Sequence, residues 1–188
     1  PLQFGPREDL RKYPRNLERD SAVCKEYTDM LFVPHADAMY PGRFLTSVKV
    51  DELSSMYCGA SRPGHFQGVT TVVNKLFNIV LPDIAYFGQK DAQQAVIIKK
   101  MVGDLSMPIE IVILPTVREY DGLALSSRNT YLSVQEREDA TVLYRSLLLA
   151  RNLAKKKKYN CAMIIAQLCT FIKKVKTARI DYIGIADL

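Results

Sequence analysis

The chain has 188 residues, enough for one large domain or two small ones. Hydrophobic residues make up 48% and charged residues 24%, as in soluble globular proteins, and no apolar run approaches the roughly 20 residues that span a bilayer. The net charge of +6 suits a nucleotide and nucleic acid equally, so charge alone selects neither. The four cysteines have no Cys-x-x-Cys spacing, which argues against a zinc site or a disulfide framework and favours reduced thiols in a cytoplasmic protein.

The first part of the chain is expected to alternate helices and strands. We predict a helix over residues 15–27, a short strand over 30–34 and another strand over 44–50, where β-branched side chains alternate. The next helix has the clearest pattern, a continuous apolar stripe formed by Val69, Val72, Val73, Leu76, Phe77 and Val80. Its opposite side is predicted to carry Thr70, Thr71, Asn74, Lys75 and Asn78.

A strand–helix–strand unit follows Pro82. Residues 84–87 predict a buried strand, a second helix runs to about residue 105, and residues 109–114 predict a further strand that Pro115 ends. This order predicts an α/β fold with a parallel sheet flanked by helices. In such sheets the ligand binds beyond the carboxyl ends of the strands.

The chain changes character after Pro115. A polar loop over 118–129 leads to a long helix that starts at Ser133, with Glu136 as its capping-box partner. A helix over 161–176 and a last strand over 180–185 complete a smaller α+β part. We place the domain boundary near Thr116, which gives domains 1–116 and 117–188. Both are expected to be incomplete, because the chain opens on a loop-like stretch and closes on a strand without a partner.

The stretch from Gly88 to Asp91 is the strongest candidate for a phosphate site. Gly88 at the end of a strand lets the backbone approach a ligand, and the following helix points its free N–H groups at the same place. Lys90 lies in the first turn of that helix, where the helix dipole disfavours a cation, so a phosphate ligand explains it better than helix stability does. The alternative is an exposed lysine beside Asp91.

Other polar residues are candidates of less specific kinds. Gln94 occupies a position where the apolar stripe of its helix predicts a hydrophobic residue, so it is either a satisfied core amide or a ligand contact. Arg62 could meet an anion. His65 could carry a proton, but it is equally a cap or packing residue and is left out of the catalytic set. The basic run 155–158 is interpreted as a solvated helix end, because no aromatic residues interleave it.

Seven motifs, taken together and in order, resemble one family. They are Pro1-Leu2-Gln3-Phe4, Tyr13-Pro14-Arg15, Met39-Tyr40-Pro41, Ser61-Arg62-Pro63-Gly64-His65-Phe66, Val72-Val73-Asn74-Lys75-Leu76-Phe77, Tyr86-Phe87-Gly88-Gln89-Lys90-Asp91 and Leu125-Ser126-Ser127-Arg128-Asn129. The chain resembles the pantothenate synthetases (pantoate–β-alanine ligases) over nearly its whole length. The resemblance implies a Rossmann-like nucleotidyltransferase fold. It also implies a two-step reaction, in which pantoate and ATP form pantoyl adenylate and pyrophosphate, and β-alanine then displaces AMP.

The resemblance also implies the roles of individual residues. Pantoate, and β-alanine nearby, would be held by Gln3 and Gln94. ATP would be held by Gly88, Gln89, Lys90, Asp91, Val117, Leu125, Ser126, Ser127 and Arg128. The catalytic residues would be Lys90, Ser126 and Arg128, and the loop 125–128 corresponds to the mobile Lys-Met-Ser-Lys-Ser-like element of related nucleotidyltransferases. Mg²⁺ would accompany ATP, with no protein ligand assigned, and a homodimer is the expected assembly.

The chain departs from the family pattern in three places. The His-x-Gly-His motif that binds ATP is absent, the closing segment is missing, and Ala38 stands where glutamate commonly precedes Met-Tyr-Pro. We therefore expect the complete parent to be active and this chain alone to be severely impaired. The rival hypotheses are a nucleotidyltransferase with another acceptor, a fragment that only binds ligand, and a non-catalytic module that binds nucleotide or RNA.

Overall fold

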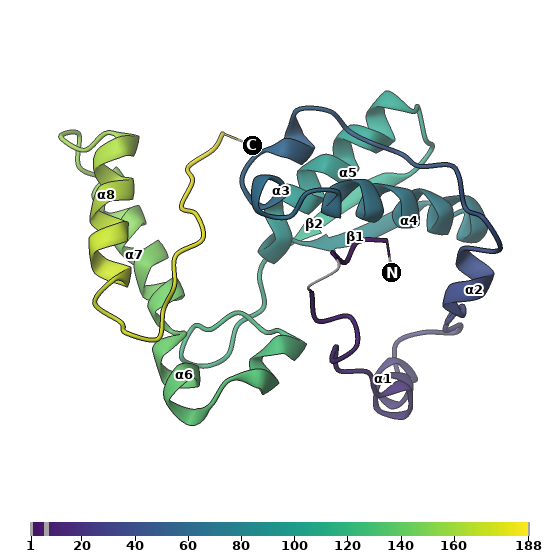
Figure 1. Cartoon of the computed structure of the whole chain (residues 1–188), viewed down its shortest axis with the longest axis horizontal. Helices are drawn as coiled ribbons and strands as arrows, with labels where there is room; N and C mark the ends of the chain where they lie inside the picture. The colour runs from purple at the N-terminus through teal and green to yellow at the C-terminus, as the bar shows by residue number, and fades with distance from the viewer. Residues whose placement is uncertain (1, 6–7, 188) are drawn as a thin grey trace.

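A two-stranded parallel sheet forms the centre of the N-terminal part in the computed structural model, which describes residues 2–5 and 8–187 (Figure 1). Strand β1 (Ile84–Gly88) pairs with β2 (Glu110–Leu114), so that Ile84 lies opposite Glu110 and Gly88 opposite Leu114. Helix α5 (Ala92–Asp104) connects the two strands. The predicted strand–helix–strand unit and its parallel sheet are confirmed.

The core lies between this sheet and the helices α4 (His65–Val80) and α5. It contains Phe66, Val69 and Phe77 from α4, together with Ile97 and Ile98 from α5, both fully buried. Burying such side chains contributes roughly 1.5–3 kcal/mol each, so the two apolar helix stripes hold this part of the fold together. The apolar stripe predicted for α4 is confirmed in its main members.

The polar side of α4 was predicted wrongly at two positions. Thr70 and Thr71 are buried, with exposed fractions of 0% and 3%. The Thr70 hydroxyl donates to the Val48 carbonyl (2.6 Å), and the Val48 N–H donates to the Thr71 hydroxyl (3.0 Å). The two threonines are buried because they satisfy the backbone of a neighbouring segment, which helix periodicity cannot reveal.

The same contacts explain why residues 44–50 are not a strand. The Val48 backbone groups in this segment bond to α4 side chains instead of to a neighbouring strand. Residues 30–34 are likewise not part of a strand in the described structure and are largely exposed. Strand β1 was expected to be buried, yet Ile84 and Tyr86 are 43% and 62% exposed, because only its Ala85 and Phe87 face packs on the core.

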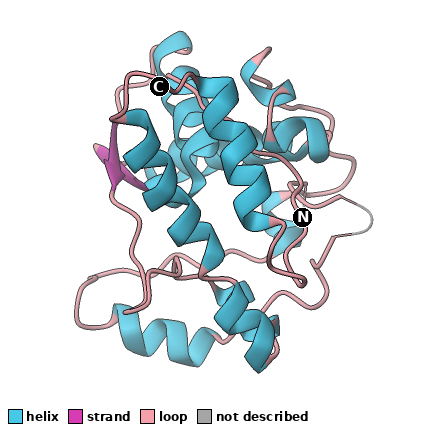
Figure 2. Ribbon diagram, turned by 90° about the vertical axis from the view of Figure 1, so that its left-hand side faces the viewer, coloured by secondary structure: helices cyan, strands magenta, loops and turns pink. Residues whose placement is uncertain are grey.

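The remaining N-terminal elements are short. They are α1 (Leu17–Cys24), where a helix over 15–27 was predicted, α2 (Ala36–Met39), the 3-10 turn η1 (Leu53–Ser55), α3 (Cys58–Ser61) and the 3-10 turn η2 (Gln89–Asp91). Figure 2 shows how strongly helices and loops dominate around the small sheet. None of the described helices combines the length and apolarity needed to span a bilayer.

The part after β2 is helical. It contains the 3-10 turn η3 (Ser127–Tyr131), α6 (Val134–Asp139), α7 (Val142–Ala154) and α8 (Cys161–Ile172), with α7 and α8 packed as an antiparallel pair (Figure 1). The capping box of Ser133 and Glu136 is confirmed. The single long helix predicted after Ser133 is divided at residues 140–141, where the Thr141 hydroxyl donates to the Glu138 carbonyl in a tighter turn. Residues 180–185 were predicted as a strand but are extended without a ladder.

Candidate functional site

The carboxyl edge of the sheet gathers several of the residues predicted to bind ATP. Because β1 and β2 are parallel and Gly88 lies opposite Leu114, both strands end at this edge. Gln89, Lys90 and Asp91 form the 3-10 turn that enters α5, and all three are exposed. Val117 follows β2 by three residues and is 66% exposed. The predicted phosphate stretch and Val117 therefore leave the sheet at the same end.

Nothing in the fold itself requires glycine at position 88. Its φ is −79°, which any residue adopts, and a side-chain Cβ built there would meet no atom within 4 Å. The first turn of α5 is also open, since its N-cap residue Asp91 makes no side-chain capping bond. A small residue beside uncapped helix N–H groups leaves room for an anionic group at that place.

Lys90 makes a long, partly exposed ion pair with Asp91. Its ammonium lies 3.4 Å from one carboxylate oxygen of Asp91 and 3.5 Å from the other. Its side chain is 38% exposed. A loose pair of this kind contributes little to stability, which leaves the ammonium available to a ligand.

The two glutamines of α5 have different roles. Gln94, predicted to contact pantoate, is half-buried and makes no side-chain hydrogen bond within the described residues. Gln93 instead accepts from the Cys58 N–H (3.2 Å) and donates to the carbonyls of Leu53 (2.8 Å) and Met56 (2.7 Å). Gln93 is thus a structural residue that fixes the η1–α3 turn to α5, whereas the Gln94 amide remains free for a ligand.

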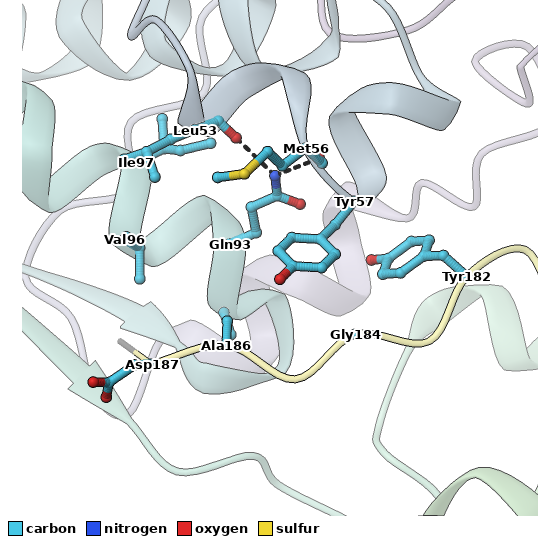
Figure 3. A pocket seen from close by; sticks show the side chains of 11 residues that line it. Leu53, Met56, Tyr57, Gln93, Val96, Ile97, Tyr182, Gly184, Ala186 and Asp187 are labelled. Carbon is cyan, nitrogen blue, oxygen red and sulfur yellow. Dashed lines mark hydrogen bonds between the residues drawn. The ribbon is translucent and has the colours of Figure 1, made fainter. Parts of the chain in front are cut away.

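Gln93 also lines a cavity of about 280 Å³ between α5 and the chain end (Figure 3). Tyr57 and Tyr182 lie next to each other in its lining, with ring centroids 6.0 Å apart, and the Tyr57 hydroxyl donates to the Ile185 carbonyl at 3.5 Å. The residues predicted to bind the substrates do not line this cavity. A second cavity of about 550 Å³ includes Gln89, Lys99 and Lys100 in its lining.

A small hairpin presents the loop that contains Ser126, Ser127 and Arg128. Arg118 and Ala124 form an antiparallel bridge, and the Leu125 N–H donates to the Val117 carbonyl at 3.0 Å. Val117 and Leu125, both predicted ATP contacts, are therefore brought side by side although they are eight positions apart in the chain. Ser126 caps the turn that follows, since its hydroxyl accepts from the Arg128 N–H.

Arg128 is bound by the N-terminal segment. Its Nε and Nη2 donate to the two carboxylate oxygens of Asp9 at 2.8 and 2.9 Å, and its guanidinium lies 5.0 Å from the Tyr13 ring centroid. The hydrogen bond from Arg128 holds the pKa of Asp9 below its ordinary value. Ser127 donates to the Tyr13 hydroxyl at 3.2 Å, so the loop contacts this segment at two consecutive residues.

Gln3, the other residue predicted to bind pantoate, is positioned through its backbone. His65 Nδ1 lies 2.7 Å from the Gln3 carbonyl, and His65 Nε2 lies 3.1 Å from Arg62 Nη1. Since a carbonyl only accepts and a guanidinium only donates, these partners select the neutral tautomer with its proton on Nδ1. Arg62 is bound in turn to both carboxylate oxygens of Glu8, one of them at 2.8 Å from Nε.

The Asp9–Arg128 pair lies close enough to the group formed by Glu8, Arg62 and His65 for their charges to interact. Burial lowers the pKa of His65 below 6.5, and the positive charges of Arg62 and Arg128 lower it further, against the Gln3 carbonyl and Glu8, which raise it. His65 was left out of the catalytic set, Glu8 and Asp9 were not considered, and Tyr13 was named only as part of a family motif. The Arg62–His65 spacing was visible in the sequence, but the acidic partners lie more than 50 residues away along the chain.

The half-buried, neutral state of His65 predicts a pH-dependent stability. Because folding lowers this pKa, the stabilisation is fully present above about pH 6.5 and is lost as pH falls towards the folded value. We expect the thermal midpoint to drop between about pH 7 and pH 5.5, and His65→Gln to flatten this slope, since an amide supplies one donor and one acceptor without titrating.

The control for this measurement is His35→Gln, at an exposed residue just before α2. The carboxyl of Glu8, whose pKa is lowered from 4.5 by the Arg62 hydrogen bond, releases its contribution only at lower pH, so the two windows are separate. An unchanged slope in His65→Gln, or a flattened one in His35→Gln, would contradict the assignment.

The described residues contain no group of three or more His, Cys, Asp or Glu side chains arranged to hold a metal ion. The donors that the site does offer are cationic and amide groups, which are suited to anions. The arrangement is therefore suited to an anionic ligand such as a phosphate.

Known proteins resemble this chain over nearly its whole length. A family model described as pantoate-beta-alanine ligase matches residues 1–188. The pantothenate synthetase of Caldicellulosiruptor saccharolyticus is 55% identical over 97% of this chain and 66% of its own length, and that of Moorella thermoacetica is 53% identical over 100% and 66%. The chain thus spans just under two thirds of the length of these curated relatives.

Solved structures extend the likeness to the fold. A crystal structure of pantothenate synthetase from Thermus thermophilus is similar with a TM-score of 0.92 and 50% identity, over 97% of this chain and 66% of that one. A pantoate-beta-alanine ligase from Francisella tularensis, complexed with beta-gamma ATP and beta-alanine, is similar with a TM-score of 0.76 and 34% identity, over 91% and 64%. The predicted α/β nucleotidyltransferase fold is confirmed.

Proposed function

The chain belongs to the pantoate–β-alanine ligase family, and on that premise we propose that its residues form much of a site for the ATP-dependent joining of pantoate to β-alanine. In the first step the pantoate carboxylate attacks the α-phosphorus of ATP and pyrophosphate leaves. In the second, the β-alanine amine attacks the acyl carbon of pantoyl adenylate and AMP leaves. The observation that carries the proposal is the open carboxyl edge of the sheet, where Lys90 and the first turn of α5 are free to bind phosphate.

Charge repulsion between carboxylate and triphosphate is the main barrier to the first step. Lys90 and Arg128 would neutralise the charge that develops on the phosphates, and the Ser126 hydroxyl would donate to a phosphate oxygen. Gln89, Asp91, Val117, Leu125 and Ser127 would line the nucleotide site. The proposal thus draws on both sides of the boundary near Thr116, with residues 1–116 holding the phosphates and 117–188 presenting the loop.

The amides of Gln3 and Gln94 would orient pantoate for this attack. Gln94 is suited to this role because its amide is not used by the protein in the described structure. Gln3 is suited because its backbone is held by His65 while its side chain is left without a hydrogen bond within the described residues. Fixing the attacking carboxylate near the α-phosphorus lowers the entropic part of the barrier.

Mg²⁺ is proposed to arrive with the nucleotide. This ion keeps several water ligands and binds mainly through phosphates and one or two carboxylates, so it needs no cage of protein side chains. When bound it would offset part of the triphosphate charge, with Asp91 as the nearest carboxylate of the proposed phosphate site. A homodimer and a cytoplasmic location are proposed from the family resemblance, and light scattering on the purified chain tests the first.

The proposed function is tested by incubating the chain with ATP, pantoate and β-alanine and measuring pantothenate and AMP. Product that forms with pantoate, but not with other hydroxy acids, supports the proposal. Equal turnover of other hydroxy acids indicates a different acceptor, and binding of ATP and pantoate without product indicates a chain that only holds its ligands. Salt-sensitive RNA binding that survives Lys90→Ala, without AMP formation, would overturn the proposal.

A further inference from the structure

A short N-terminal segment, residues 9–13, lies directly against the 3-10 turn η3 that contains Arg128. Three side-chain contacts join them besides the ring contact of Tyr13. Arg128 donates twice to Asp9, Ser127 donates to the Tyr13 hydroxyl, and the Tyr131 hydroxyl donates to the Lys12 carbonyl at 2.8 Å. These residues are more than 110 positions apart in the chain, so the contact is a tertiary one.

The guanidinium of Arg128 is held on one edge and one face only. Asp9 occupies the Nε edge, and Tyr13 covers a face at 5.0 Å from its ring centroid. Nη1 makes no hydrogen bond within the described residues, and the side chain remains 45% exposed. An arginine has five N–H donors, so the Asp9 contacts leave the outer edge able to bind a second anion.

The residue before Asp9 also binds an arginine. Glu8 binds Arg62, three residues before the start of α4, through both carboxylate oxygens. Successive carboxylates thus bind two arginines from different parts of the chain, Arg62 ahead of α4 and Arg128 in η3. Because the two ion pairs use different arginines, the Glu8–Arg62 pair can be removed without changing the Asp9–Arg128 contact.

We propose that Asp9 is a positioning residue for the nucleotide site: it fixes the Arg128 guanidinium so that its free outer edge meets the phosphates of ATP. The inference rests on the proposed function. Arginine has several rotatable bonds, and ordering it on binding would cost conformational entropy, which a pre-formed ion pair removes in advance. Asp9 thereby increases the affinity for ATP through Arg128, without contacting the nucleotide.

A double-mutant cycle tests this role, with ATP affinity measured by titration calorimetry. Asp9→Asn keeps the size of the side chain and removes its charge. We expect it to weaken ATP binding by roughly three- to tenfold, and to weaken it by less than about twofold when Arg128 is already alanine, because the effect passes through Arg128. The matched control is Glu8→Gln, which removes the neighbouring ion pair without touching Arg128. Its effect is expected to be the same in both backgrounds.

Each other outcome overturns the inference in a distinct way. Tighter ATP binding by Asp9→Asn would show that Asp9 competes with the phosphates for Arg128. An unchanged affinity would show that Arg128 needs no such support, and an equal loss in both backgrounds would show that Asp9 acts elsewhere. Failure of the unsubstituted chain to bind ATP would overturn the proposed function together with the inference, whereas binding without coupling would overturn the inference alone.

Discussion

Lys90→Ala is expected to lower the rate of pantoate-dependent exchange of pyrophosphate into ATP by roughly 100-fold or more, while the free energy of unfolding stays nearly unchanged. Removal of one charge-stabilising group from a transition state typically costs about 3–4 kcal/mol of activation free energy. Stability is preserved because the only ion pair of Lys90 in the described structure, with Asp91, is long and partly exposed. A cation in the first helical turn also opposes the helix dipole.

The matched control is Lys100→Ala. Lys100 is also on α5, is exposed, and pairs with Asp104 one turn later. Its replacement is expected to leave exchange within about twofold of the unsubstituted chain, because it lies outside the predicted phosphate stretch. If Lys90→Ala retained most of the exchange rate, or if the two lysine variants lost it equally, Lys90 would have no specific role in the reaction.

Gly68→Ala is expected to displace the segment that carries Gln3 and to weaken pantoate binding by roughly tenfold or more. Gly68 lies within α4, where the backbone of Leu2 and Gln3 crosses the helix. A Cβ at this position would overlap the Leu2 carbonyl group and would lie only 2.5 Å from the Gln3 nitrogen. Backbone atoms cannot turn aside as a side chain can, so the segment must move.

The control again comes from α5. Gly103 is a helical glycine whose Cβ would meet nothing within 4 Å, so Gly103→Ala should stabilise the fold by up to about 1 kcal/mol through helix propensity. Gly68→Ala gains the same helix propensity but loses the close contact of α4 with the backbone of Leu2 and Gln3. Its free energy of unfolding in urea should therefore be lower than that of Gly103→Ala. Unchanged pantoate affinity in Gly68→Ala would contradict the role of Gln3.

Local patterns in the sequence predicted the elements that are stabilised by contacts between residues close together in the chain. The apolar stripe of α4, the β1–α5–β2 unit and the capping box at Ser133 are of this kind. The wrong predictions concern long-range partners. Residues 44–50 have the alternation of a strand, but the Val48 backbone bonds to Thr70 and Thr71 of α4, and the same contact buries those two threonines.

The candidate site divides in the same way. The Gly88–Asp91 stretch was predicted from local chemistry, a glycine between a strand and a helix with a lysine in its first turn. The supports of Gln3 and Arg128 were not, because His65, Glu8 and Asp9 reach them across 54 to 119 residues of sequence. Neither the adjacent Glu8 and Asp9 nor His65 has a local sequence pattern that indicates these long-range contacts.

Exchange of labelled pyrophosphate into ATP, measured with pantoate and without β-alanine, isolates adenylation from the second step. We expect exchange that requires pantoate and that falls sharply in Lys90→Ala. Exchange that proceeds equally without pantoate, or that is unchanged in Lys90→Ala, would contradict the claim that these residues form an adenylating site.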